Sequence, residues 1–158
     1  MARGIEMRDL ARGIGAILRE LVVPKSAYDY HPVAQIRTNV IESPASFFVK
    51  HTHSWSYEIG LVAQHRFPMV LPDNWQEPTF RLTATWDDKL QREWHLVGRY
   101  LPWWGEKDAG FSLVRYSVPD DIPKNQKVQF ELSVVVPSSQ FFEFSAADGV
   151  YCCRFSDK

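Results

Sequence analysis

Two histidines separated by one residue, His51 and His53, have the spacing in this chain that best suits metal chemistry. Alternate side chains of a strand project from one face, so both imidazoles could bind the same ion. A complete site needs a third ligand from His65, His95 or Asp73, and the sequence alone brings none of them close. Because the pair lies near the end of the predicted strand 45–51, we expect solvated polar histidines and no metal cofactor. His51 and His53 remain the candidate ligands.

Three tryptophans lie in segments rich in turn-forming residues and are candidates for binding. Trp103 and Trp104 are adjacent, and neighbours in an extended chain point to opposite sides, so we expect one indole to be exposed. Trp75 lies in a long irregular stretch, residues 64–77, and loops of that length often carry function. An exposed indole can stack on a sugar or anchor a protein interface, or it can cap the end of the fold. The predicted binding residues are Trp75, Trp103, Trp104, Asp73 and Asn74.

Sequence motifs of the common enzyme classes are missing. The chain has no Gly-x-Ser-x-Gly elbow, no phosphate-binding glycine loop and no dinucleotide fingerprint. Adjacent acids at Asp87–Asp88 and Asp120–Asp121 fall in predicted turns, where carboxylates mostly support the local backbone. We therefore predict a protein that is not an enzyme, and a metal-dependent enzyme built on the histidines stays a second alternative.

The elements that must position these residues are predicted to be short β-strands. Apolar and polar residues alternate with a period of two, as in Phe80, Leu82 and Ala84, which is typical of a sheet with one buried face. Several such segments without helices between them favour an all-β fold, a two-sheet antiparallel β-sandwich with Greek-key or jelly-roll-like connectivity. The predicted strands are 35–41, 45–51, 55–63, 78–86, 91–100, 110–118, 127–136, 140–145 and 150–155, the last two forming a closing hairpin.

Only the beginning of the chain has a helical period. Apolar residues recur about every 3.6 positions between Ile5 and Val22, which predicts a short amphipathic N-terminal helix. We therefore divide the chain into an N-terminal helical segment, residues 1–24, and a β-sandwich domain, residues 25–158.

Bulk composition limits the partners and the compartment. The formal net charge of −1 without a basic stripe disfavours a nucleic acid, and no apolar run is long enough for a transmembrane segment. Cys152 and Cys153 are adjacent, so we expect two reduced thiols with one facing the core. Charged residues near the start exclude a secretory signal, so the chain as written predicts a cytoplasmic location. A leader removed before the first residue would instead make the protein exported or periplasmic.

Three segments give the chain a likeness to known proteins: residues 46–50 as a Phe-rich opening strand, residues 57–61, and residues 128–132 after a proline-containing turn. This layout resembles an uncharacterised family of small bacterial β-sandwich proteins, often lipoproteins or exported, some associated with toxin immunity. The resemblance carries over no catalytic residue. From the rigid scaffold, the long proline-containing loop, the exposed indoles and the lack of catalytic motifs, we expect a protein-binding module, such as an immunity or inhibitor protein acting through loops at one end of the sandwich. A carbohydrate-binding module that uses the tryptophans on a glycan is the alternative.

Overall fold

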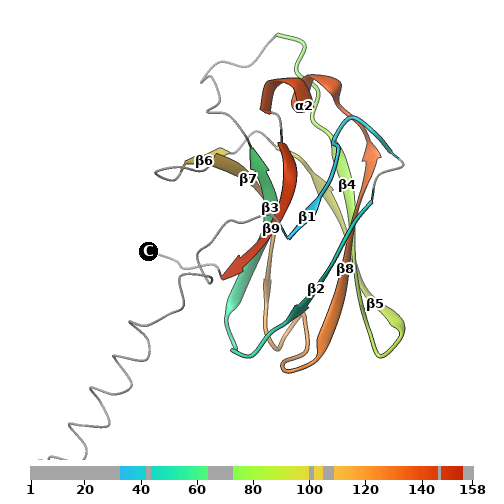
Figure 1. The fold of residues 1–158 in the computed structure, drawn as a ribbon, viewed down its shortest axis with the longest axis vertical. Helices are drawn as coiled ribbons and strands as arrows, with labels where there is room; N and C mark the ends of the chain where they lie inside the picture. Colours follow the sequence, from blue (N-terminus) through green and yellow to red (C-terminus); the bar gives the residue numbers. More distant parts are fainter. Residues whose placement is uncertain are drawn as a thin grey trace, which may run out of the picture.

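The computed structural model describes residues 33–41, 44–63, 73–99, 102–104, 109–145 and 147–154. Within this part the strands form two antiparallel sheets, which lie as two layers in Figure 1. Sheet A has the spatial order β1 (Ala34–Gln35), β9 (Ala147–Arg154), β3 (Ser56–Ala63), β7 (Ala109–Ser117) and β6 (Pro102–Trp104). Sheet B has the order β2 (Ala45–Lys50), β8 (Lys127–Val136), β4 (Thr79–Trp86) and β5 (Lys89–Val97). One short helix, α2 (Ser139–Ser145), connects β8 to β9.

The two-residue period builds one core between the sheets. On β4, Phe80, Leu82 and Ala84 are buried while Arg81 is exposed, as the alternation predicts. Sheet A contributes Ile59 and other inward side chains to the same cluster. The mainly antiparallel β architecture is therefore confirmed. The cluster comprises Ile36, Ala45, Phe47, Ile59, Leu61, Phe80, Leu82, Ala84, Phe111, Tyr116, Val118, Ile122, Val128, Phe130, Leu132, Val134, Phe141 and Val150.

Most consecutive strands lie in different sheets. Only the β4–β5 and β6–β7 pairs are joined within one sheet, whereas each of the other connections crosses from one layer to the other. At the β4–β5 turn, Asp87 and Asp88 have φ values of 53° and 55°, which suits a two-residue hairpin. Asp121 accepts a hydrogen bond from Ser117 N at 2.8 Å, so this acid supports the local backbone as predicted.

Two predicted strands are wrong in part. Residues 140–145 belong to helix α2, because Ser138 caps it: the amide of Phe141 donates to Ser138 Oγ at 3.1 Å. The closing hairpin is therefore not formed, and β9 instead pairs with β3 and β1. The predicted strand 35–41 is reduced to Ala34–Gln35, since the amide of Val40 bonds back to Arg37 O in a turn.

The predicted N-terminal helix, within residues 1–24, lies outside the described residues. In the described part, no helix has the length and apolar character needed to cross a membrane.

Candidate functional site

Three connections of the chain meet at the end of the fold where helix α2 lies (Figure 1). We call this end the rim and define it as residues 36–41, 73–78 and 137–140. Ser138 holds the rim together, because its amide donates to Thr38 O at 3.1 Å and its hydroxyl donates to Gln76 O at 2.7 Å. The amide of Gln76 also donates to Gln140 Oε1 at 3.1 Å. The rim is thus a cross-linked surface built from segments far apart in sequence.

The rim exposes both apolar and polar side chains. Val40 is 37% exposed and Ile41 is 55% exposed. Asp73 and Asn74, two of the predicted binding residues, are exposed on the second connection of the rim. A surface with aliphatic and hydrogen-bonding groups in this mixture is typical of protein contacts.

Trp75, a third predicted binding residue, is half-buried at the base of the rim. Its ring lies 5.8 Å from that of Phe141, and the side chain packs against the core. This position corresponds to the other interpretation that the sequence allowed, an indole that caps the end of the fold. Trp75 therefore positions the exposed Asp73 and Asn74.

Trp103 and Trp104 lie on β6, at the edge of sheet A. Their backbones pair with Gly110 and Ala109, and their side chains lie outside the described part of the structure. The segment predicted to be all turn thus contains a short strand. Its first residue pairs with Phe111, whose ring lies 4.7 Å from that of Phe141, so β6 starts close to the base of the rim.

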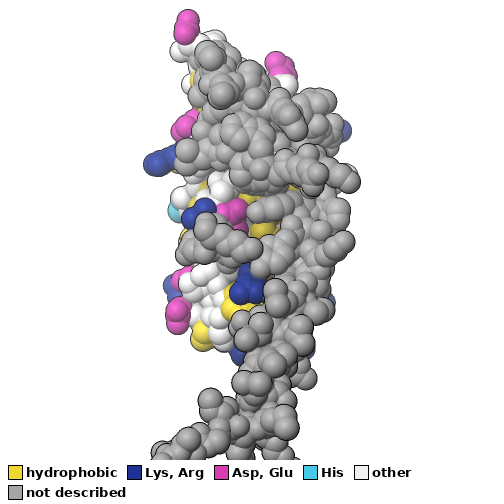
Figure 2. All heavy atoms as spheres, turned by 90° about the vertical axis from the view of Figure 1, so that its left-hand side faces the viewer, with side chains coloured by type: hydrophobic (Ala, Val, Ile, Leu, Met, Phe, Trp, Pro, Cys, Tyr) yellow, Lys and Arg dark blue, Asp and Glu magenta, His cyan; other side chains and the backbone are white. Residues whose placement is uncertain are grey.

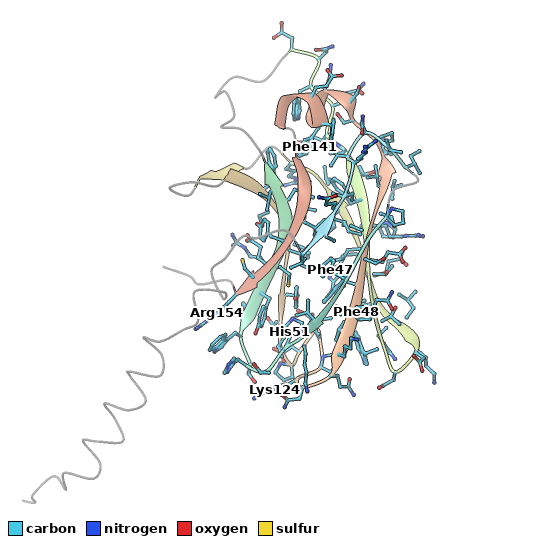
Figure 3. All side chains as sticks on the ribbon, viewed as in Figure 1. Phe47, Phe48, His51, Lys124, Phe141 and Arg154 are labelled. Carbon is cyan, nitrogen blue, oxygen red and sulfur yellow. The ribbon has the colours of Figure 1, made fainter. Side chains whose placement is uncertain are left out.

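His51 and His53 do not form a shared site. His53 is exposed and stacks on Trp55, with ring centroids 4.2 Å apart, whereas His51 is 1% exposed. The prediction that His51 is solvated is wrong, because the chain turns into the core after β2, at the opposite end from the rim (Figure 3). In the described ranges no group of three metal-binding side chains occurs.

The buried imidazole of His51 belongs to a small polar chain inside the core. His51 Nε2 lies 2.8 Å from Tyr116 Oη, which lies 3.3 Å from Cys152 Sγ. Edge-on aromatic rings of Tyr57 and Phe130 complete its surroundings. Burial lowers the pKa of His51 from 6.5 to about 4. His51 is therefore neutral at physiological pH and acts as a structural group.

Both cysteines are free thiols, as predicted. Burial raises the pKa of Cys152 to about 11, and the hydrogen bond with Tyr116 offsets part of this rise. Burial, with the nearby Glu58 and Cys152, raises the pKa of Cys153 to about 12. Because the thiolate is the reactive form of cysteine, neither residue is an activated nucleophile.

Sequence reasoning missed a buried carboxylate on the outward side of β3. Glu58 is 4% exposed, and it accepts hydrogen bonds from Tyr151 Oη at 2.6 Å and Arg115 Nε at 2.9 Å. Tyr151 reaches Glu58 by lying across Gly60, where a Cβ atom would come within 2.5 Å of its hydroxyl. The available signal was a glycine in the middle of a strand, which often marks a close approach. Ser138 was missed too, although a serine three residues before Phe141 is a helix-capping signal.

The described charges on the sheet A side of the molecule are mixed in sign, with Lys and Arg side chains interspersed among Asp and Glu side chains (Figure 2). Of the predicted binding residues, the structure places Asp73, Asn74 and Trp75 in the rim. Comparisons of the chain with protein-family models, with curated proteins and with solved structures give no match.

Proposed function

We propose that this chain is a non-enzymatic protein-binding module that uses the rim as its contact surface. The observation that carries the proposal is the hydrogen bonding of Ser138 to two separate connections, which fixes the exposed Val40, Ile41, Asp73 and Asn74 on one rigid frame. A surface that is ordered before binding loses less conformational entropy when a partner docks. The rim therefore has the property that a specific binding surface needs.

The composition of the rim suggests how a partner would bind. Val40 and Ile41 would enter an apolar depression of the partner, and burying such a side chain contributes about 1.5–3 kcal/mol. Asp73 and Asn74 would accept hydrogen bonds at the border of the contact, where they add selectivity more than affinity. The partner surface should therefore combine an apolar depression with donor groups.

We further infer that the scaffold is a jelly-roll β-sandwich. Without the short β6, sheet A has the order β1-β9-β3-β7 and sheet B has the order β2-β8-β4-β5. Every connection except the β4–β5 turn then crosses from one layer to the other. This order is that of two interleaved Greek keys. In such a scaffold the connections gather at the two ends of the sandwich, and one of these ends is the rim.

An immunity or inhibitor protein is the form of this function that the sequence resemblance suggests, and the rim supplies a rigid surface for it. The carbohydrate-binding alternative now depends on Trp103 and Trp104, because the indole of Trp75 packs on Phe141. Titrating a glycan panel while following tryptophan fluorescence separates the two functions, since a stacked sugar perturbs indole emission.

Affinity capture with the full chain from cells of its source tests the proposal. The wild-type chain should retain one protein at a reproducible ratio, and the Ile41→Asp variant should lose at least about tenfold in affinity, because it places a charge in the apolar contact. Val33→Asp is the matched control, since Val33 is 47% exposed beside β1 at the edge of sheet A and lies outside the rim. Equal retention by both variants, or no protein retained by the wild type, would contradict the proposal.

A further inference from the structure

The outer face of sheet B carries its side chains in rows that cross the strands. The strand registers place these residues side by side, and their side chains point away from the core. Lys50 and Lys127 form a short basic row at one edge of the face, next to the row of Phe48. The other four rows span three or four strands, and of these the two outer rows carry apolar side chains and the two inner rows carry charged side chains. These four rows are Val97, Thr79 and Val136; His95, Arg81 and Ser133; Glu93, Thr83, Glu131 and Ser46; and Leu90, Thr85, Gln129 and Phe48.

The ends of this face expose apolar side chains that a folded chain usually buries. Val97, Val136, Leu90 and Phe48 are between 43% and 59% exposed. In Figure 3, Phe48 lies on the outside of sheet B, whereas its neighbour Phe47 belongs to the core. Lys127 Nζ lies 4.1 Å from the centre of the Phe48 ring, so a lysine borders this part of the face. Apolar groups on both sides of the charged rows indicate a contact surface.

The two central rows have opposite charge. Arg81 is exposed in one row, and its neighbour across the strands is His95. The next row contains two carboxylates, Glu93 and Glu131, on either side of Thr83. Within the same chain, Glu93 Oε1 lies 3.0 Å from His95 Nε2 of the first row. The order of rows along the strands is therefore apolar, basic, acidic and apolar.

We propose that this face binds the same face of a second copy of the chain. A two-fold axis that runs along the rows, midway between the basic and the acidic row, places each basic row opposite the acidic row of the other copy. Arg81 then lies between Glu93 and Glu131 of the second copy. The same rotation covers the row that contains Val97 with the row that contains Phe48, so both ends are also complementary.

The order of the charged rows favours this arrangement over a dimer whose two-fold axis runs parallel to the strands. A two-fold axis parallel to the strands would place basic rows opposite basic rows and acidic rows opposite acidic rows, and both contacts would repel. The axis along the rows also keeps the strands of the two facing sheets close to antiparallel, within the range of aligned sheet packing.

The size of the face sets the strength of the dimer. From strand spacing and rise, the four rows span about 14 Å by about 20 Å between backbone centres, which places the contact at the small end of specific interfaces. We therefore expect a dimer with a dissociation constant in the range of about 10 μM to about 1 mM. This contact is separate from the proposed function of the rim, and either of them can fail while the other stands.

Sedimentation velocity of the full chain from about 10 μM to about 2 mM tests the dimer, since this range spans the expected dissociation constant. The wild type should shift from monomer to dimer with increasing concentration. Arg81→Glu should be monomeric, because it makes both central rows acidic. The double variant Glu93→Arg with Glu131→Arg should be monomeric too, because it makes both rows basic.

Mixing the two monomeric variants is the decisive step. In a mixed pair, each acidic row of one variant faces a basic row of the other, so the mixture should form a heterodimer. Lys124→Glu is the control, because it makes the same change of charge as Arg81→Glu at an exposed position at the lower end of the molecule (Figure 3). This variant should dimerise like the wild type. Circular dichroism checks the fold of each variant. If Arg81→Glu does not fold, Thr83→Arg, which would meet Arg81 of the second copy, replaces it in the single-variant measurement and not in the mixture.

A wild type that stays monomeric throughout this range would overturn the proposal. A dimer that survives both charge changes would also overturn it, because the contact would then lie elsewhere. A mixture of the two variants that remains monomeric would exclude the predicted axis.

Discussion

The neutral His51 inside the core makes the stability of this protein sensitive to acid. Its pKa is lowered from 6.5 to about 4 in the folded chain, so below pH 6.5 the unfolded chain binds a proton that the folded chain does not. Stability is therefore fully present above pH 6.5 and decreases as the pH falls toward 4. From these two values, the free energy of unfolding should fall by about 2 kcal/mol between pH 7 and pH 5, and by about 3 kcal/mol between pH 7 and pH 4. Below pH 4 this contribution should level off.

Urea unfolding, followed by tryptophan fluorescence at a series of pH values, measures this effect. The His51→Phe variant keeps an aromatic ring between Tyr57 and Phe130 but cannot titrate, so its stability should depend less on pH by about 3 kcal/mol over the same interval. His53→Phe is the matched control, because His53 is exposed, and its curve should run parallel to that of the wild type. The reasoning is refuted if the His51→Phe curve falls as steeply between pH 7 and pH 4 as the wild-type curve.

Two further substitutions test the close contacts that the sequence did not reveal. Gly60→Ala should lower the free energy of unfolding, measured in urea, by about 3 kcal/mol or more, because the new Cβ would overlap Tyr151 Oη and the carbonyl oxygen of Phe111. An unchanged midpoint of urea unfolding would contradict this, because it would show that the Tyr151 ring moves aside without cost. Ser138→Ala should cost about 1–2 kcal/mol and weaken partner capture, since it removes the helix cap and the bond to Gln76 O. Ser54→Ala, at an exposed position outside the rim, should do neither, and equal effects at both positions would contradict the role of Ser138.

The strands were predictable because their cause is local. A side chain on β8 faces the core or the solvent according to its position in the alternation, and the bounds of the strand, residues 127–136, were predicted without error from that pattern. Val136, which the pattern placed inward, is 51% exposed because the register shifts beside it. The same logic failed at residues 140–145, where closely spaced aromatics imitate a strand. Whether such a segment becomes a strand or a helix depends on the Ser138 cap and on the space that the core offers to Phe141.

The candidate site was predictable only in part. Turn-forming residues marked the region of Asp73 and Asn74, but the rim depends on Ser138, Thr38 and Gln76, which lie far apart in sequence. Sequence spacing also suggested that His51 and His53 share a face, whereas β2 ends at Lys50 and the chain then turns His51 into the core. Nothing local records such a turn.

By itself, the sequence determined the all-β architecture, the inward and outward sides of the central strands and the free state of the two cysteines. These follow from the geometry of one extended chain and its nearest neighbours. The tertiary structure decided which loops meet in the rim, how His51, Tyr116 and Cys152 form one buried chain, and how charged rows align across sheet B. The physical reason is that strand order and register bring together residues whose separation in sequence carries no signal of their contact.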